Sequence, residues 1–389
     1  MLTVLLFLLI LSVLVVVHEF GHFICARRSG MRVFEFGWGF PPRAFGVYRD
    51  PRTKRVVWVW GRGRGSLSQT GGGEERSEEY PATLYSVNWL PLGGFVKIKG
   101  ENGEEAAEPD SFGYQKTWKK IITLVAGVVM NFLLAAGLFG FGLMIGLPAD
   151  VSVLEDKWAR VVEEPRVLIQ QVEKDSPADQ AGLVFGDTIV SLDGERVGRS
   201  SEVIERVRSS ADKTLTVGIL RAGQEKTLEI KPSPLKGGEA PRLGVMLADA
   251  GIIRYPWYIA WYKGLVAAWF GLLNIFVSFY TLIRQLILGG GLAFSVSGPV
   301  GIAVVIGQSA RLGLSYLINI TAMISLSLAA INILPIPALD GGRVLFIAIE
   351  RLTRRKVPLK YEQLAHTVGF LLLMALIIVV TWRDVRQLF

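Results

Sequence analysis

The residues best suited to chemistry in this sequence are two histidines and a glutamate within five positions, His18-Glu19-Phe20-Gly21-His22. On an α-helix, positions i and i+4 share a face, so both imidazoles can reach one metal ion while Glu19 stands beside it. Catalytic zinc centres combine such imidazoles with an open coordination position and a nearby carboxylate. We therefore expect His18 and His22 to bind a metal and Glu19 to be catalytic. Two histidines that only hydrogen-bond within a helix bundle are the alternative.

A catalytic zinc site needs a third protein ligand, and the sequence offers two candidates. His366 is the other histidine of the chain, but it follows a basic stretch and belongs to no motif. Asp340 is the better candidate, because it follows an apolar segment that two prolines interrupt, where freed backbone groups need partners. A helix cap is the alternative role for Asp340. Nitrogen and oxygen ligands also suit other divalent ions, so zinc is inferred from ligand type.

Composition places these residues in a membrane protein. Of the 389 residues, 51% are hydrophobic and 20% are charged, and the apolar residues form long runs. This pattern excludes a disordered or fibrous protein and is atypical of a soluble one. A run of about 20 apolar residues can cross the hydrocarbon core. Four segments are expected as transmembrane helices: 1–26, 121–147, 317–342 and 364–382.

The segment 255–312 is expected to form amphipathic helices at the membrane interface. Its first half is apolar and rich in Trp and Tyr, but Lys263, Asn274 and Arg284 interrupt it. Aromatic residues and scattered cations are typical of helices that lie at the headgroup level. The sequence therefore favours an interfacial position over a fifth span.

Basic residues flank three of the expected spans, at Arg27-Arg28, 116–120 and 351–360. By the positive-inside rule these flanks lie in the cytoplasm, so both chain termini are expected outside it. The metal-binding end of the first helix is then near the cytoplasmic side. The same flanks account for the net charge of +8, so no nucleic-acid partner is expected.

Two regions outside the spans have a β pattern. The cytoplasmic region 27–120 contains the strand-like segments Val56–Trp60 and Asn88–Lys99, followed by an acidic run, Glu101–Asp110, expected to be a solvated loop. The extracytoplasmic region 149–248 resembles a circularly permuted bacterial PDZ domain in its SPA, AGL and GD.I pattern, which begins at Ser176. A PDZ domain binds an extended peptide, usually a free terminus, at a sheet edge; a spacer without a ligand is the alternative.

Together these motifs resemble the site-2 protease family of intramembrane zinc proteases, and its bacterial RseP-type group in particular. The resemblance rests on HEFGH at 18–22, on Asn332…Pro335…Pro337…Leu339-Asp340-Gly341 and on the PDZ-like region between the second and third spans. It extends to three further segments, 37–40, 90–97 and 126–132. The fold class it implies is a multi-pass α-helical membrane protein with about four spans, a membrane-associated β element and an inserted extracytoplasmic PDZ-like α+β domain.

The resemblance also implies a role for each site residue. His18, His22 and Asp340 would bind Zn²⁺, Glu19 would be the catalytic acid and base, and Asn332 would hold substrate or the developing oxyanion. A membrane-reentrant β element would contact substrate through four residues of one strand: Gly93, Gly94, Phe95 and Val96. One PDZ-like domain instead of two, and an insertion between Trp60 and Tyr80, depart from the best-known proteobacterial members.

The partners implied by the resemblance are single-pass transmembrane proteins of the bacterial cytoplasmic membrane, already trimmed by an earlier protease. Anti-sigma factors and remnant signal peptides are the two substrate types it suggests. Two other kinds of protein were weighed against the protease. A PDZ-bearing scaffold with a structural metal predicts that Glu19→Gln leaves function intact. A metal transporter predicts inverted repeats, which the sequence does not show.

Overall fold

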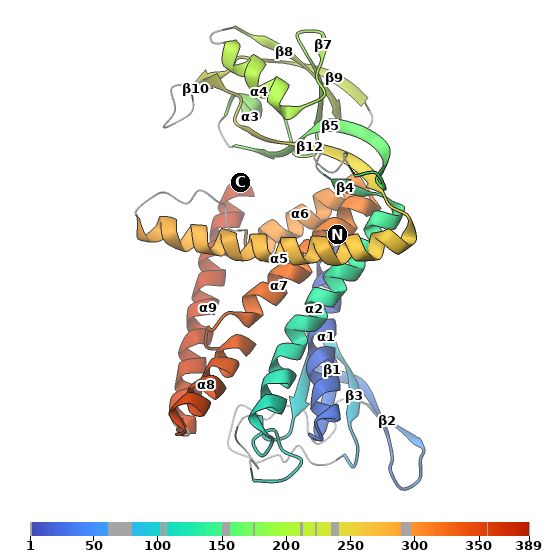
Figure 1. Cartoon of the computed structure of the whole chain (residues 1–389), viewed down its shortest axis with the longest axis vertical. Helices are drawn as coiled ribbons and strands as arrows, with labels where there is room; N and C mark the ends of the chain where they lie inside the picture. Colours follow the sequence, from blue (N-terminus) through green and yellow to red (C-terminus); the bar gives the residue numbers. More distant parts are fainter. Residues whose placement is uncertain are drawn as a thin grey trace. The chain divides into compact units, whose positions relative to one another are not determined.

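The fold is described from a computed structural model of the whole chain (Figure 1). The structure describes residues 2–60, 80–101, 103, 107–149, 156–173, 176–210, 213–221, 224–234, 241–288, 297–355 and 357–388. The chain divides into two compact units. The first unit comprises residues 1–135, 268–307 and 321–389, and the second comprises 136–267 and 308–320. The insertion between Trp60 and Tyr80 lies outside the described residues.

Five helices of the described chain are long and apolar enough to cross a membrane. They are α1 (Leu2–Arg28), α2 (Thr117–Ile145), α5 (Trp257–Ile287), α7 (Leu314–Ile333) and α9 (Leu359–Leu388). Two shorter helices, α6 (Pro299–Leu312) and α8 (Asp340–Thr353), lie between them in the chain. The surface of α9 is apolar and exposed, as expected where lipid replaces water. The predicted multi-pass helical fold is confirmed.

Helix α5 is the candidate span that the sequence placed at the interface instead. Its length and its mean hydropathy of 1.8 qualify it as a span. However, its part within the first unit, residues 268–287, runs across the direction of α7 and α9 in Figure 1. The start of α1 and the end of α9 also lie at the same end of this unit, as an even number of spans requires. Both observations support the interfacial position, which stays a prediction.

A bent sheet packs beside α1 in the first unit. It contains β1 (Val33–Arg49), β2 (Val56–Trp60) and β3 (Leu84–Ile98), in the order β2-β1-β3. Both long strands bend, so that Phe36 of β1 pairs with Tyr85 and also with Val96 of β3. Phe23 of α1 joins the apolar cluster that this sheet forms with the helices. The sheet thus lies against the helix that carries the two histidines.

The second unit contains the domain expected to be PDZ-like. Its sheet has the order β4-β12-β5-β6-β8-β9, with β7 (Glu195–Arg196) paired to β6, and a separate ribbon joins β10 (Ser233–Pro234) to β11 (Pro241–Arg242). The sheet strands are β4 (Leu147–Ala149), β5 (Arg160–Val172), β6 (Thr188–Leu192), β8 (Leu215–Arg221), β9 (Gln224–Ile230) and β12 (Val245–Arg254). Two short helices cover its apolar core, α3 (Pro177–Gln180) and α4 (Ser200–Ser209). The result is the expected α+β domain.

The GD.I motif of this domain provides its buried ion pair. Asp187 is fully buried, and its carboxylate accepts hydrogen bonds at 2.7 Å from Nε and from Nη2 of Arg221. The backbone N–H of Val184 donates to the same carboxylate at 3.0 Å. Burial of a carboxylate is costly unless such partners satisfy it, so this motif is a structural feature of the domain.

Asp187→Ala is expected to lower the free energy of unfolding of the second unit by about 2–3 kcal/mol, because the Val184 N–H loses its acceptor and Arg221 keeps only its hydrogen bond to the carbonyl oxygen of Gly182. Limited proteolysis of the full chain across a urea series measures the change. Glu205→Ala, which removes an exposed carboxylate from α4, is the matched control and should change little. Equal unfolding midpoints for the two variants would contradict the assignment.

Candidate functional site

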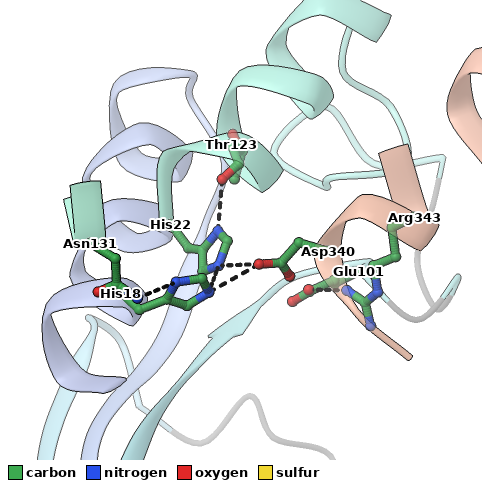
Figure 2. Close-up of polar contacts among 7 residues, drawn as sticks. All are labelled: His18, His22, Glu101, Thr123, Asn131, Asp340 and Arg343. Carbon is green, nitrogen blue, oxygen red and sulfur yellow. Dashed lines mark hydrogen bonds and ion pairs between the residues drawn. The ribbon is translucent and has the colours of Figure 1, made fainter. Parts of the chain in front are cut away.

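Two helices of the first unit bring the predicted ligands together (Figure 2). His18 and His22 lie one turn apart on α1, both buried, with their ring centroids 4.8 Å apart. Asp340 is the first residue of α8 and faces them. Its Oδ2 atom is 3.0 Å from Nε2 of His18 and 3.3 Å from Nε2 of His22, and the two Nε2 atoms are 3.1 Å apart. Residues 322 positions apart in the chain thus meet at one point.

The convergence of these three atoms fits a zinc ion. Ligand atoms about 2.0–2.1 Å from a tetrahedral centre are themselves about 3.3 Å apart, close to the observed spacings. Two imidazole nitrogens with one carboxylate oxygen are also a common catalytic zinc set, which leaves a fourth position open. Within the part of the chain that the structure describes, these residues form the one group of three or more candidate ligands.

The outer nitrogens of both imidazoles are held by α2. Nδ1 of His22 lies 2.7 Å from the carbonyl oxygen of Thr123, so Nδ1–H donates there and the Nε2 lone pair faces the cluster. Nδ1 of His18 lies 3.4 Å from the side-chain amide of fully buried Asn131. The Oδ1 atom of that amide has no partner among the described residues. Exchanging its O and N positions lets Oδ1 accept from Nδ1–H of His18 and leaves both Nε2 atoms ready for a metal.

Helix α2 can approach the histidines because its facing residue is a glycine. A Cβ on Gly127 would lie 2.6 Å from Nε2 of His22 and 2.7 Å from Nε2 of His18. Between the two histidines on α1, a Cβ on Gly21 would lie 2.4 Å from the carbonyl oxygen of Ala126. The two helix backbones are therefore in contact at the site, as small residues permit in membrane helices.

A broken helix positions Asp340. Helix α7 ends at Ile333, and the following loop, with its two prolines, leads to the start of α8. The backbone N–H of Ala338 in this loop donates to Nδ1 of His366 at 2.8 Å. His366, the alternative third ligand, therefore supports the loop that carries Asp340.

Ion pairs join this part of the site to the sheet. Arg343 on α8 pairs with Glu101 just after β3, as Figure 2 shows. Buried Lys99 pairs with Glu108 and with Asp110, and these hydrogen bonds, that of Glu108 first, raise the pKa of the Lys99 ammonium group. Each of these three acids has a specific cation, but the side chains of Glu108 and Asp110 are still 52% and 41% exposed, whereas that of Glu101 is 22% exposed.

The remaining predicted residues make no hydrogen bond to the three candidate ligands within the described ranges. The half-buried Glu19 carboxylate makes no hydrogen bond to another residue in the described ranges. A Cβ on Gly94 of β3 would lie 3.0 Å from Val16 of α1, and Gly93 faces Val15 in the same way.

The other three predicted residues lie on β3 and α7. Phe95 and Val96 pair with Gly37 and Phe36. Asn332 lies at the end of α7, partly buried, and among the described residues no hydrogen bond joins it to the ligands.

Sequence reasoning assigned no role to the residues that hold the ligands in place. Thr123, Gly127 and Asn131 recur every fourth position on one face of an otherwise apolar helix. This spacing of small and polar residues was the available signal. The Arg343–Glu101 pair has no comparable signal, because its partners lie 242 residues apart.

The chain is similar to known proteins over nearly its whole length. The sequence profile described as "Peptidase family M50" matches residues 6–57 and 76–376. The chain is similar to the "Putative zinc metalloprotease R01501" of Rhizobium meliloti (strain 1021), at 30% identity over 408 residues, covering 98% of this chain and 96% of that protein. It is also similar to the "Regulator of sigma-W protease RasP" of Bacillus subtilis (strain 168), at 28% identity over 441 residues, covering 100% and 99%.

A solved structure is similar to part of the chain. The PDZ domain of an SdrC-like protein from Listeria monocytogenes shares 26% identity, covering 21% of this chain and 85% of that one, with a TM-score of 0.20.

Gly127→Ala is expected to weaken zinc binding at least about tenfold, because its methyl group would displace both imidazoles from the cluster. Zinc content after dialysis against a graded chelator series measures the loss. Gly137→Ala is the matched control on the same helix, since a Cβ there meets nothing within 4 Å. Equal zinc retention by the two variants would contradict the packing of α2 against the ligands.

Proposed function

The chain belongs to peptidase family M50, and from this premise we propose that it hydrolyses a peptide bond in or near the transmembrane segment of single-span membrane proteins. As a family member it is an intramembrane zinc metalloprotease, similar to RasP. One observation carries the proposal: the ligand atoms of Asp340 and of two histidines on α1, a helix apolar enough to span a membrane, converge at one point beside the Glu19 carboxylate. An ionisable cluster in that setting is costly and functional by default.

The chemistry divides between the metal and the chain. Zinc, when bound, supplies Lewis-acid polarisation of the scissile carbonyl and activation of a water molecule. Glu19 takes the proton from that water and later delivers it to the leaving amine. Thr123 and Asn131 hold the imidazole rings in the tautomers that a metal requires. Asn332 donates from its side-chain amide to substrate or to the developing oxyanion.

A substrate in lipid arrives as a helix whose backbone amides are already hydrogen-bonded, so it must unwind before cleavage. Strand β3 is suited to hold the unwound segment, because it lies at one edge of its sheet and packs on α1 next to the histidines. An extended peptide can add to such an edge through main-chain hydrogen bonds. Gly93, Gly94, Phe95 and Val96 would form this substrate contact.

The proposal also covers the class of substrate and the membrane topology of the chain. The name of the Bacillus subtilis relative refers to a sigma factor, which supports anti-sigma factors as substrates, with remnant signal peptides as the second type. An earlier protease trims them, and the PDZ-like domain binds their free peptide termini.

The chain lies in a bacterial cytoplasmic membrane with both termini outside the cytoplasm and the zinc site near the cytoplasmic side. The cations Arg27 and Arg28, which follow the histidines, favour this orientation.

Glu19→Gln is expected to lower cleavage of a co-expressed single-span reporter at least about 100-fold, because the amide cannot accept the proton from water. Zinc content should stay at the wild-type level, since Glu19 is not a ligand. His22→Ala, which removes a ligand, should lose both zinc and cleavage. Unchanged cleavage by Glu19→Gln would overturn the protease mechanism and favour a metal-bearing scaffold.

A proline at Val96 tests the role of β3. Val96→Pro removes a main-chain donor from the strand, so it should reduce cleavage of a helical transmembrane substrate and spare a peptide that is already unfolded. Quantifying both cleavage products in the same detergent measures the difference. Trp89→Pro, at the exposed bend of β3, is the matched control. Equal loss with both substrates would count against strand addition.

A further inference from the structure

The hairpin of β1 and β2 has a strongly basic turn. We name residues 45–60 the basic hairpin. Its turn holds four exposed cations, Arg49, Arg52, Lys54 and Arg55, against one carboxylate, that of Asp50. Nothing in the peptidase reaction uses this concentration of positive charge.

The one carboxylate of the turn is occupied by the turn itself. Asp50 Oδ1 accepts from the backbone N–H of Arg52 at 2.8 Å, and Oδ2 accepts from the hydroxyl of Thr53 at 3.0 Å. These hydrogen bonds, that of the Arg52 N–H first, lower the pKa of the Asp50 carboxyl. The side chains of Arg52, Lys54 and Arg55 form no ion pair with the described residues. The turn therefore presents cations that are free for an outside anion.

An exposed aromatic face continues from this turn along β2. Val56, Trp58 and Trp60 alternate outward and are 60%, 56% and 71% exposed. The two indole rings stack with centroids 6.0 Å apart, and Phe45 of β1 packs against both. A contiguous apolar face of this kind marks an interaction site, and tryptophan is the residue enriched at membrane interfaces.

The distance between the cations and the indoles is long enough to cross a lipid headgroup layer. Arg55 precedes Trp58 by three strand residues, about 10 Å. Each headgroup layer is about 5–8 Å thick, so a strand entering it places the indoles inside and the turn at the phosphates. In Figure 1 the hairpin reaches past the end of α1 that carries Arg27 and Arg28. That end is the one expected at the cytoplasmic surface.

We propose that the basic hairpin binds the anionic lipid surface of the cytoplasmic leaflet, with Trp58 and Trp60 in the interface and the turn cations at lipid phosphates. The positive charge of the turn favours anionic lipid over neutral lipid. The binding does not depend on peptidase activity. Because β1 lies between β2 and β3 in the sheet, the lipid contact also steadies the strand proposed to receive substrate.

The test uses the full chain in vesicles of equal parts phosphatidylcholine and phosphatidylglycerol, in which one lipid or the other carries bromine, a quencher of tryptophan fluorescence. Subtracting the quenching of a Trp58→Phe, Trp60→Phe double variant isolates the two indoles. Brominated phosphatidylglycerol should quench them at least about threefold more strongly than brominated phosphatidylcholine. High salt should reduce this preference.

Two triple variants separate the hairpin from the other basic ends. Substituting glutamine for the three free turn cations, Arg52, Lys54 and Arg55, should abolish the preference while the indoles stay quenched by both lipids. The matched control substitutes glutamine for three exposed cations near the end of α8, Arg351, Arg354 and Arg355, and should keep it.

Three results would overturn the proposal. Equal quenching of the wild-type indoles by the two lipids would remove the anionic site. Quenching by neither lipid would show that the aromatic face does not meet the membrane, and would favour an acidic protein segment as its partner. If the α8 control also lost the preference for phosphatidylglycerol, that preference would come from the overall charge of the protein and not from the hairpin.

Discussion

The rest of the structure depends on one constraint, which is to hold two imidazoles of the apolar helix α1 together with the carboxylate at the start of α8. Each of these groups is costly to bury without a partner. The structure meets this constraint because the three groups are polar partners of one another, and together they can bind one zinc ion. The close approach of α1 and α2 at Gly21 and Gly127 follows directly, since a larger side chain at either position would separate the helices or displace the rings. The carbonyl of Thr123 then lies where His22 can donate to it.

The same constraint explains why the third ligand comes from a broken segment. A continuous α7 would carry Asp340 further along its own axis, whereas the proline-containing loop after Ile333 starts a second helix at that residue. The loop is held from α9 by His366 and α8 is tied to the sheet through Arg343 and Glu101. The site, the broken helix and the β element are thus one connected arrangement, and β3 lies beside the catalytic helix because its glycines allow contact with α1.

The sequence predicted the parts of this arrangement that local pattern determines. The i, i+4 spacing of His18 and His22 and the interrupted run before Asp340 were sufficient to select three candidate ligands, whose atoms the structure brings together, and apolar runs located the helices. Contacts between residues far apart in the chain could not be predicted from the sequence. Asn131 and His18 are 113 residues apart, and Glu101 and Arg343 are 242 residues apart. The acidic run was predicted to be a solvated loop, and the pairing of its acids with nearby Lys99 and with Arg343 of α8 was not predicted. Helix α5 is a case in which a local pattern is ambiguous, because apolar length alone does not distinguish a transmembrane helix from an interfacial one.

The most direct test of the account is the identity of the third zinc ligand. X-ray absorption at the zinc edge should be recorded for Asp340→Cys and for its parent, both in a Cys25→Ser background that removes the one native cysteine. The account predicts one sulfur about 2.3 Å from zinc in the variant and none in the parent. A zinc shell without sulfur in a zinc-loaded Asp340→Cys protein would contradict the assignment of Asp340 and, with it, the site on which the proposed function rests.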